Sequence, residues 1–195
     1  MGTELNLIKK LRDETGAGIV DCQKALAKTN DNLEKAIILL RKEGQKIVAK
    51  KQERQTKQGL VGIYLHSNGK VGAIVALNCE TDFVARTEEF KELAHDLAMQ
   101  VAAANPLYLA PEDVPAQVIK QEEDIYHEQL VNEGKSRAIL DKIVKGKMDK
   151  YFEEVCLLRQ KFIKDDKKII DELIKERIAK FGENIQIKDF KRLSL

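Results

Sequence analysis

A pair of β-rich runs joined by a short turn constrains the fold of this chain more than any other feature. Residues 60–65 and 71–77 are dominated by aliphatic and β-branched side chains, and Asn68-Gly69 lies between them. Asn-Gly between two such runs is the strongest short-range signal of a β-hairpin. The second run is almost entirely apolar, so we expect both of its faces to be covered. Any fold for this chain must therefore contain an antiparallel sheet.

The first 45 residues have the apolar periodicity of three short helices instead. Breaks fall at Gly16 to Gly18 and at Asn30 to Asn32, where turn and N-cap residues gather, and Gly44 is placed to cap the third helix. A bundle this small buries little apolar surface, so we expect it also to present a face to a partner. The three apolar stripes are Leu7, Ile8 and Leu11; Ile19, Val20, Ala25 and Leu26; and Leu33, Ala36, Ile37 and Leu40.

A basic, polar stretch follows the three helices and separates them from the β-hairpin. Its cations are Lys46, Lys50, Lys51, Arg54 and Lys57. Two interpretations remain open for this stretch: a solvated linker or extension of the third helix, or a surface that contacts phosphates.

A helical region begins at Thr87, and its apolar residues recur at i, i+3, i+4 and i+7 until Asn105-Pro106. Further helices are predicted at 116–132, 136–145, 147–161 and 167–181, with Gly182 as the residue that ends the last one. Ile185, Ile187 and Phe190 predict a final strand that joins the hairpin sheet. We therefore predict an α+β fold with a three-helix domain over 1–45, a basic connector over 46–58 and an α+β core over 59–195.

Composition narrows the classes of function. The formal net charge is only +2, which argues against a dedicated nucleic-acid binder. No apolar run approaches the roughly 18 residues of a membrane span, and the first ten residues have no apolar segment typical of a signal peptide. Cys22, Cys79 and Cys156 are far apart, which disfavours a zinc site and favours free thiols in a reducing cytoplasm. We expect no bound metal and no membrane association.

A search for catalytic and nucleotide-binding motifs favours a binding protein over an enzyme. The sequence contains no phosphate-binding loop of the Gly-x-x-x-x-Gly-Lys-Ser/Thr kind and no Gly-x-Gly-x-x-Gly after a strand. It also lacks the Gly-x-Ser-x-Gly and His-Glu-x-x-His patterns of hydrolases. Adjacent carboxylates such as Glu88-Glu89 lie in polar helical contexts and read as solvated faces. We therefore expect no cofactor and no nucleotide bound by this chain itself.

One local feature follows the second β-rich run directly. Asp82 and Phe83 lie between the predicted strand end and the helix that begins near Thr87. Asp82 could cap a turn while Phe83 packs in the core. Alternatively, Phe83 is an exposed aromatic side chain that wedges into a partner, where such anchors contribute about 2 kcal/mol or more.

Four segments resemble the elongation factor Ts family, in the family's order and over almost the whole chain. They are residues 11–26 (LRDETGAGIVDCQKAL), 78–86 (NCETDFVAR), 155–166 (VCLLRQKFIKDD) and 181–185 (FGENI). The resemblance implies a ubiquitin-associated-type three-helix head and an α+β core, in agreement with the elements predicted above.

The resemblance also implies a function and a partner. Members of this family bind the GDP form of elongation factor Tu, open its nucleotide and magnesium site and stabilise the empty state. Thr81, Asp82, Phe83 and Val84 match the segment that intrudes beside the partner's magnesium region. Arg12, Ile19 and Val20 match head residues that contact the partner's GTPase domain.

The chain departs from the family pattern in places. Ile19-Val20 stand where many members have two methionines, and Gln23 stands where lysine is common. Long members carry a duplicated core and a coiled-coil insertion, whereas this chain resembles the short form, which implies a homodimer. The rival interpretation is an RNA-binding accessory protein that uses the basic connector.

Overall fold

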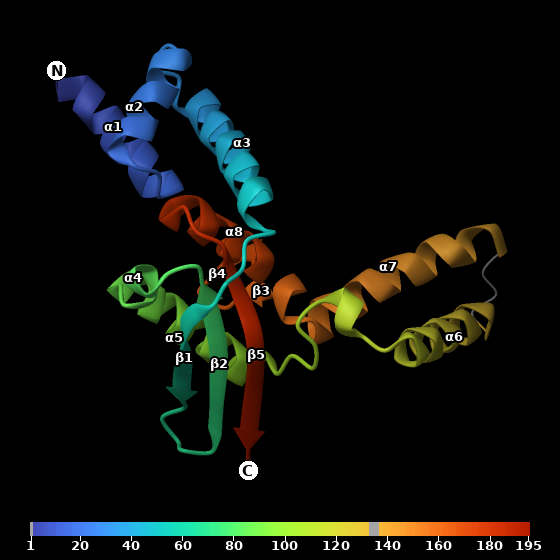
Figure 1. The fold of residues 1–195 in the computed structure, drawn as a ribbon. Helices are drawn as coiled ribbons and strands as arrows, with labels where there is room; N and C mark the ends of the chain where they lie inside the picture. Colours follow the sequence, from blue (N-terminus) through green and yellow to red (C-terminus); the bar gives the residue numbers. More distant parts are fainter. Residues whose placement is uncertain (1, 133–136) are drawn as a thin grey trace. The chain divides into compact units, whose positions relative to one another are not determined.

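The computed structural model describes residues 2–132 and 137–195, and their helices and strands form an α+β fold, as predicted. The chain divides into two compact units, and Figure 1 labels the helices and strands that they contain. The first comprises Met1–Leu60, Leu77–Lys91 and Glu172–Gln186, and the second comprises Val61–Ala76, Glu92–Asp171 and Ile187–Leu195. Within the described residues, no helix is both long enough and apolar enough to cross a membrane.

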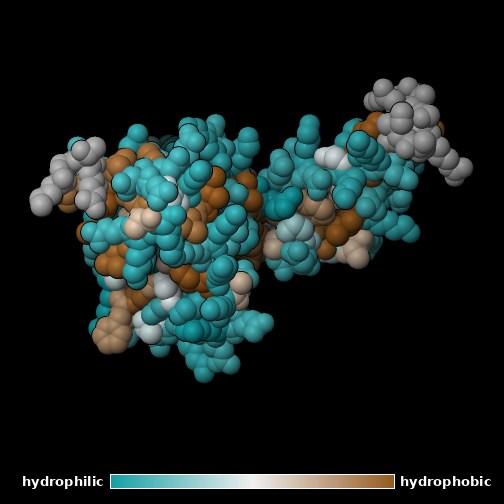
Figure 2. All heavy atoms as spheres, turned by 90° about the horizontal axis from the view of Figure 1, so that it is seen from above, coloured by the Kyte–Doolittle hydropathy of each residue, from teal (hydrophilic) through white to brown (hydrophobic). Residues whose placement is uncertain are grey.

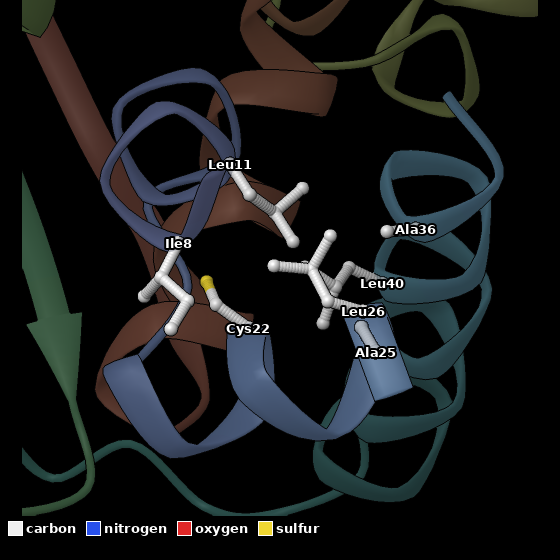
Figure 3. Close-up of a cluster of buried hydrophobic side chains, with 7 residues drawn as sticks. All are labelled: Ile8, Leu11, Cys22, Ala25, Leu26, Ala36 and Leu40. Atoms are coloured by element: carbon white, nitrogen blue, oxygen red, sulfur yellow. The ribbon is translucent and has the colours of Figure 1, made fainter. Parts of the chain in front are cut away.

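The three predicted N-terminal helices are confirmed as α1 (Gly2–Thr15), α2 (Ile19–Lys28) and α3 (Leu33–Lys51). Gly16 ends α1 in the left-handed region at φ 66°, and the Asn32 side chain accepts a hydrogen bond from the Lys35 N–H at 2.9 Å to cap α3. Buried side chains of all three helices point toward one another (Figure 3): Ile8, Leu11, Cys22, Ala25, Leu26, Ala36 and Leu40.

The prediction that Gly44 ends the third helix is wrong. α3 continues through Gly44 to Lys51 because its buried stripe continues: Ala36, Leu40 and Val48 are all buried and spaced by multiples of four. A Cβ at Gly44 would lie 3.4 Å from the Ala179 Cβ. Gly44 therefore lies inside the helix, where it packs beside Ala179 of the same unit, and does not cap the helix. The first half of the basic connector is therefore an extension of α3.

The predicted hairpin is confirmed as β1 (Gln58–Leu65) and β2 (Val71–Cys79). Gly69 adopts φ 67° in the loop, and the His66 N–H donates to the Val71 carbonyl at 2.8 Å. The predicted final strand, β5 (Ile185–Ser194), joins the sheet beside β2, giving the order β1-β2-β5 in an antiparallel arrangement.

Only one face of the sheet is covered, so the expectation that both faces of β2 are buried is wrong. Ala73, Val75 and Leu77 are buried, whereas Ile74 between them is 44 % exposed. On β1, Gly62 faces helix α5 (Glu88–Ala104), where an added Cβ would lie 2.3 Å from the Ala94 carbonyl oxygen. The missing side chain lets the strand and helix approach closely, and the opposite face of the sheet is open.

The helix predicted from Thr87 is confirmed as α5, which stops before Asn105-Pro106. The segment after it contains a short 3₁₀ helix, η1 (Pro111–Asp113), and an isolated parallel bridge between Tyr108 and Cys156. Another 3₁₀ turn, η2 (Leu157–Arg159), follows that bridge.

Helix α6 (Ala116–Asn132) has the predicted bounds, but residues 137–155 form one helix, α7 (Arg137–Val155), where two were predicted. The expected break near Gly146 fails because the apolar spacing continues across it, through Leu140, Val144 and Met148. The predicted start of this region at Ser136 lies outside the described residues. α6 and α7 pack against each other around a separate hydrophobic cluster. Figure 2 shows hydrophobic residues exposed among hydrophilic ones on the surface of this helix pair.

A small hairpin, β3 (Lys161–Phe162) and β4 (Asp165–Ile169), replaces the predicted ends of two helices. The buried side-chain amide of Gln100 holds this hairpin: its Nε2 donates to the Lys161 carbonyl at 3.1 Å, and its Oε1 accepts from the Ile163 N–H at 2.9 Å. Helix α8 (Ile170–Phe181) therefore begins later than predicted and ends at Gly182, as expected, with φ 68°.

Candidate partner-binding site

The segment that the sequence singles out forms a short turn immediately after β2. Thr81 has extended backbone and N-caps α4 (Asp82–Ala85), a single helical turn. The Thr81 carbonyl accepts the Ala85 N–H at 3.3 Å, and the Asp82 carbonyl accepts the Arg86 N–H at 3.1 Å. Thr81, Asp82, Phe83 and Val84 therefore lie together in one compact turn.

Phe83 is 80 % exposed, whereas Ala85 in the same turn is buried and Val84 is half-buried. The alternative in which Phe83 packs in the core is therefore not what the chain adopts. Single exposed apolar residues are ordinary on protein surfaces. A phenylalanine this exposed, on a turn anchored through Ala85, nevertheless has the geometry of an anchor for a partner.

Asp82 has a partner within the turn. Its Oδ2 lies 2.9 Å from Nη2 of Arg86 one turn later, and both side chains are substantially exposed. An exposed ion pair of this kind contributes little to stability. The Asp82 carboxylate is thus available to exchange Arg86 for another cation or for a hydrogen-bond donor.

Glu183 holds the beginning of the turn. Its Oε2 accepts the Thr81 N–H at 3.0 Å, and its Oε1 accepts the Thr81 hydroxyl at 2.7 Å. The Thr81 hydroxyl oxygen also accepts the Val84 N–H at 3.4 Å. Glu183 was part of the FGENI segment in the sequence, but nothing in its spacing indicated a contact with Thr81.

Glu80 precedes Thr81 and ties the end of β2 to the connector. Its carboxylate accepts the Asn184 N–H at 2.7 Å and lies 3.3 Å from Nη1 of Arg54 and 3.9 Å from Nζ of Lys51. Burial by itself would raise the pKa of Glu80, but the hydrogen bond from Asn184 and the two cations outweigh it and lower that pKa. Two of the five connector cations therefore balance a carboxylate of the same unit.

The thiol of Cys79 completes the support beneath the turn. Burial, followed by the nearby charge of Glu183, raises the pKa of Cys79 to about 11. The thiol therefore stays protonated at neutral pH and donates to the Thr81 carbonyl at 3.1 Å. Cys22 and Cys156 are also free, buried thiols.

The head residues lie on the three-helix bundle. Ile19 and Val20 open α2 and are 52 % and 57 % exposed, so they do not belong to the bundle's core. Gly18 is their N-cap and supplies no side-chain hydrogen bond. Arg12, near the end of α1, is exposed as well. Ile38 on α3 is also 52 % exposed, although it lies beside the core stripe.

No cluster of three or more metal-ligating side chains is present within residues 2–132 and 137–195. An open groove of about 440 Å³ lies on the α6–α7 pair, away in sequence from the residues predicted to bind a partner. Its lining mixes acidic, basic and apolar residues: Glu123, His127, Asp141, Val144, Lys145, Met148, Asp149 and Phe152.

Comparison with known proteins matches the chain to a family model over nearly its full length. Residues 6–195 match the family model described as "Elongation factor TS". A protein named "Elongation factor Ts" from Thermotoga petrophila is 52 % identical over 195 residues, covering 100 % of this chain and 97 % of the relative.

Proteins of the same name from two other organisms are similar as well. The relative from Maridesulfovibrio salexigens is 51 % identical over 100 % of this chain and 95 % of its own length. The relative from Coprothermobacter proteolyticus is 50 % identical over 100 % of this chain and 99 % of its own length. Identity at this level over the whole of both chains, together with the family model, establishes that the chain belongs to the elongation factor Ts family.

Proposed function

We propose that this protein is a guanine nucleotide exchange factor for elongation factor Tu and acts in translation elongation. The observation that carries the proposal is Phe83, an aromatic side chain that is 80 % exposed on a turn fixed to the body of the first unit. Membership of the elongation factor Ts family supplies the partner.

Exchange follows from differential binding. A factor that binds the empty GTPase more tightly than the GDP-bound form must, by thermodynamic linkage, weaken GDP binding by the same ratio. Only contacts that differ between the two partner states contribute. Phe83 would enter the partner beside its magnesium and phosphate region, where its ring fits the opened state and not the closed one. The surplus of GTP over GDP in the cell then sets the direction of exchange.

Asp82, Thr81 and Val84 have different parts in this proposal. Asp82 would bring a carboxylate toward the partner's magnesium shell and leave its ion pair with Arg86, a pair whose 2.9 Å contact is exposed and therefore costs little to break. Thr81 holds the turn through Glu183, and half-buried Val84 extends the apolar surface beside Phe83.

Arg12, Ile19 and Val20 form the second proposed contact, with the partner's GTPase domain. The two aliphatic side chains are more than half exposed at the start of α2. Replacing the two methionines common in the family, they offer a contact that is apolar but less adaptable, because branched side chains have fewer rotamers than methionine.

The exchange factor is proposed to do no covalent chemistry and to bind no nucleotide, because all of its effect comes from the partner's conformational equilibrium. We place it in the cytoplasm, where translation takes place; the three free, buried thiols are in keeping with a reducing compartment.

The RNA-binding alternative has less support. Of the connector cations, Lys51 and Arg54 lie within 3.9 Å and 3.3 Å of the Glu80 carboxylate, which reduces the charge available to phosphates. Lys46, Lys50 and Lys57 are exposed. RNA binding through them would fall steeply with added salt, whereas an interface built on Phe83 would resist salt.

The decisive measurement is release of fluorescent GDP from purified elongation factor Tu. Substoichiometric amounts of this protein should accelerate release, without GTP hydrolysis when the partner is left out. The acceleration should persist when the salt concentration is raised from 50 to about 200 mM, a range over which a protein contacting several phosphates loses about 10³-fold or more in affinity. An unchanged release rate with a matched bacterial partner contradicts the proposal.

We also propose that the protein forms a homodimer through the open face of its sheet. Apolar side chains alternate along β1 and recur on β5, where each is more than half exposed: Val61, Ile63, Leu65 and Leu193. Gly72 on β2 lies on the same face, since its Cβ position is 3.5 Å from the Leu65 Cδ1. Exposed apolar side chains in a row along one strand mark an interaction surface, and a second copy of the same face would bury them.

Light scattering over a dilution series tests the dimer. The wild-type protein should have about twice the 22.1 kDa mass of one chain, and Ile63→Asp should shift it to the single-chain mass. Ile38→Asp is the matched control, because Ile38 is similarly exposed but lies on α3 of the other unit. A mass of one chain at every wild-type concentration would exclude the dimer.

A further inference from the structure

The turn that exposes Phe83 cannot hold its own shape. α4 has only four residues, and a helix that short does not recover the entropy of its nucleation. Phe83 adds no packing because its ring is 80 % exposed. The conformation of the turn must therefore come from contacts with other segments of the chain.

Glu183 makes the most direct of these contacts. Its two carboxylate oxygens accept both polar hydrogens of Thr81, from the backbone N–H at 3.0 Å and from the hydroxyl at 2.7 Å. Because the hydroxyl hydrogen is committed to Glu183, a lone pair of the same oxygen faces the Val84 N–H, which it accepts at 3.4 Å. Hydrogen bonds to an ionised carboxylate are short and about twice as strong as neutral ones. One side chain thus fixes both the start and the cap of the turn.

The backbone of Glu183 is itself held on both sides. Gly182 turns the chain at φ 68°, with its N–H donating to the Ile178 carbonyl at 2.9 Å. Asn184 is 1 % exposed, and its Nδ2 donates to the carbonyls of Gln52 at 3.1 Å and Arg54 at 2.8 Å. A carboxylate on so constrained a segment is placed before any partner arrives.

We propose that Glu183 is a positioning residue for nucleotide exchange: its carboxylate clamps Thr81 and thereby fixes the direction in which Phe83 is presented. The inference rests on the proposed function, since it assigns Phe83 the contact that opens the partner's site. A ring that is already oriented gives up less conformational freedom on binding, so the clamp raises affinity for the opened state without touching the partner.

The clamp makes a prediction that a purely structural glutamate would not. Glu183→Ala should slow stimulated GDP release about 10- to 100-fold, the range expected for losing hydrogen bonds to a charged group. Glu183→Gln should recover most of the rate, because the amide oxygen can accept the Thr81 N–H while the amide nitrogen donates to the Thr81 hydroxyl oxygen. Glu89→Ala is the control: it removes a carboxylate of the same unit that pairs with Nζ of Lys180 on α8 at 2.9 Å instead of with Thr81, and it should leave release unchanged.

A double-mutant cycle separates positioning from general stability. In a Phe83→Ala background, Glu183→Ala should have little further effect on release, because there is no ring left to orient. Equal losses in the presence and absence of Phe83 would overturn the inference, and so would a Glu183→Gln variant as slow as Glu183→Ala. Melting temperatures on the same preparations identify any loss that comes from unfolding.

A second readout needs no partner and keeps the two proposals distinguishable. Fluorine NMR of 4-fluorophenylalanine incorporated at Phe83 reports the order of the ring directly. Glu183→Ala should move and narrow the signal, whereas Glu183→Gln and Glu89→Ala should leave it near the wild-type position. An unchanged signal in Glu183→Ala overturns the clamp even if exchange is confirmed. A changed signal in Glu183→Ala, together with a wild-type protein that does not stimulate GDP release, supports the clamp and contradicts the proposed function instead.

Discussion

Two helices of this molecule, α2 and α4, expose apolar side chains in their first turn, and different kinds of contact hold the two helices in place. Ile19 is the first residue of α2, a ten-residue helix whose other face is buried in the head. Phe83 is the second residue of α4, a four-residue helix held by Glu183 from 102 positions away in the sequence. The head surface depends on local apolar periodicity, whereas the α4 turn depends on long-range polar contacts.

This difference decides what a mutation in each region can do. Ile19 can be changed without touching the side chains that hold α2, because Cys22, Ala25 and Leu26 face the bundle core. In the α4 turn, Phe83, the residue proposed to contact the partner, lies only two residues from Thr81, through which Glu183 holds the turn. A mutation in this turn is therefore interpreted together with a mutation of the distant residue that contacts the turn, as in a double-mutant cycle with Glu183.

The largest effect is expected at Phe83. Phe83→Ala should slow stimulated GDP release by about 30- to 1,000-fold, since losing one aromatic anchor costs about 2–4 kcal/mol at an interface. The melting temperature should hardly change, because the ring is 80 % exposed. A core phenylalanine would instead cost about 3–5 kcal/mol of stability.

Leu107→Ala is the control for Phe83→Ala. Leu107 is also a largely exposed apolar side chain, at 61 %, but it lies between α5 and η1. It should leave both GDP release and melting unchanged. If Phe83→Ala melts much earlier and exchanges normally while folded, the ring stabilises the protein and is not the anchor.

The sequence predicted the features that depend on local patterns and missed those that depend on long-range hydrogen bonds. Helical periodicity located the head and the break before Ile19, and alternation with Asn68-Gly69 located the hairpin. The β3–β4 hairpin was missed because the buried Gln100 side chain imposes it through hydrogen bonds to residues more than 60 positions away. The clamp on Thr81 was missed likewise: Glu183 looked like an ordinary polar residue after a helix end.

The continuation of α3 through Gly44 shows the reverse error. Glycine is a good helix terminator in isolation, but the buried positions on either side, Leu40 and Val48, continue the helix's apolar stripe. Packing of that stripe outweighs the roughly 1 kcal/mol that a glycine costs inside a helix. Local propensity therefore predicted the wrong boundary where tertiary contacts decide.

A smaller effect is expected from the head. Ile19→Asp should weaken binding to elongation factor Tu about tenfold, because a charge replaces an apolar contact worth about 1–2 kcal/mol. Helical circular dichroism should be retained, since Ile19 is 52 % exposed. Ile38→Asp is the matched control, with the same exposed fraction on α3 of the same bundle, and should bind normally. Loss of helicity in Ile19→Asp would mean that the residue stabilises the bundle.

Arg12 should contribute less than Ile19. It is an exposed cation on α1, and charges at the rim of an interface mainly affect the association rate. Arg12→Ala should lower the association rate a few-fold at low salt, an effect that should vanish at about 0.5 M salt through screening. Stopped-flow binding at two salt concentrations measures it, with Arg12→Lys as the charge-preserving control. A salt-independent loss would point to a specific hydrogen bond instead of a rim charge.

The smallest effect concerns the acid stability of the segment behind the α4 turn. The pKa of Glu80 is lowered in the folded chain, so the unfolded state binds its proton first as the pH falls. The stabilisation by Glu80 is therefore fully present above its ordinary pKa of about 4.5 and is lost as the pH falls through the lower, folded value. Glu80→Gln should lower the melting temperature at pH 7 by at most about 2–4 °C, the shift that about 1 kcal/mol gives in a chain of this size. The difference from wild type should shrink as the pH is lowered from 6 to 3, measured by circular dichroism.

Glu88→Gln is the control, since the Glu88 side chain is 87 % exposed and pairs only with its helical neighbour among the ion pairs described. A difference between Glu80→Gln and wild type that stays constant down to pH 3 would mean that the Glu80 contribution does not come from its charge. The link between β2 and the connector would then depend on packing, as the head does. The Thr81–Glu183 contact would remain as the long-range polar contact that distinguishes the α4 turn from the head.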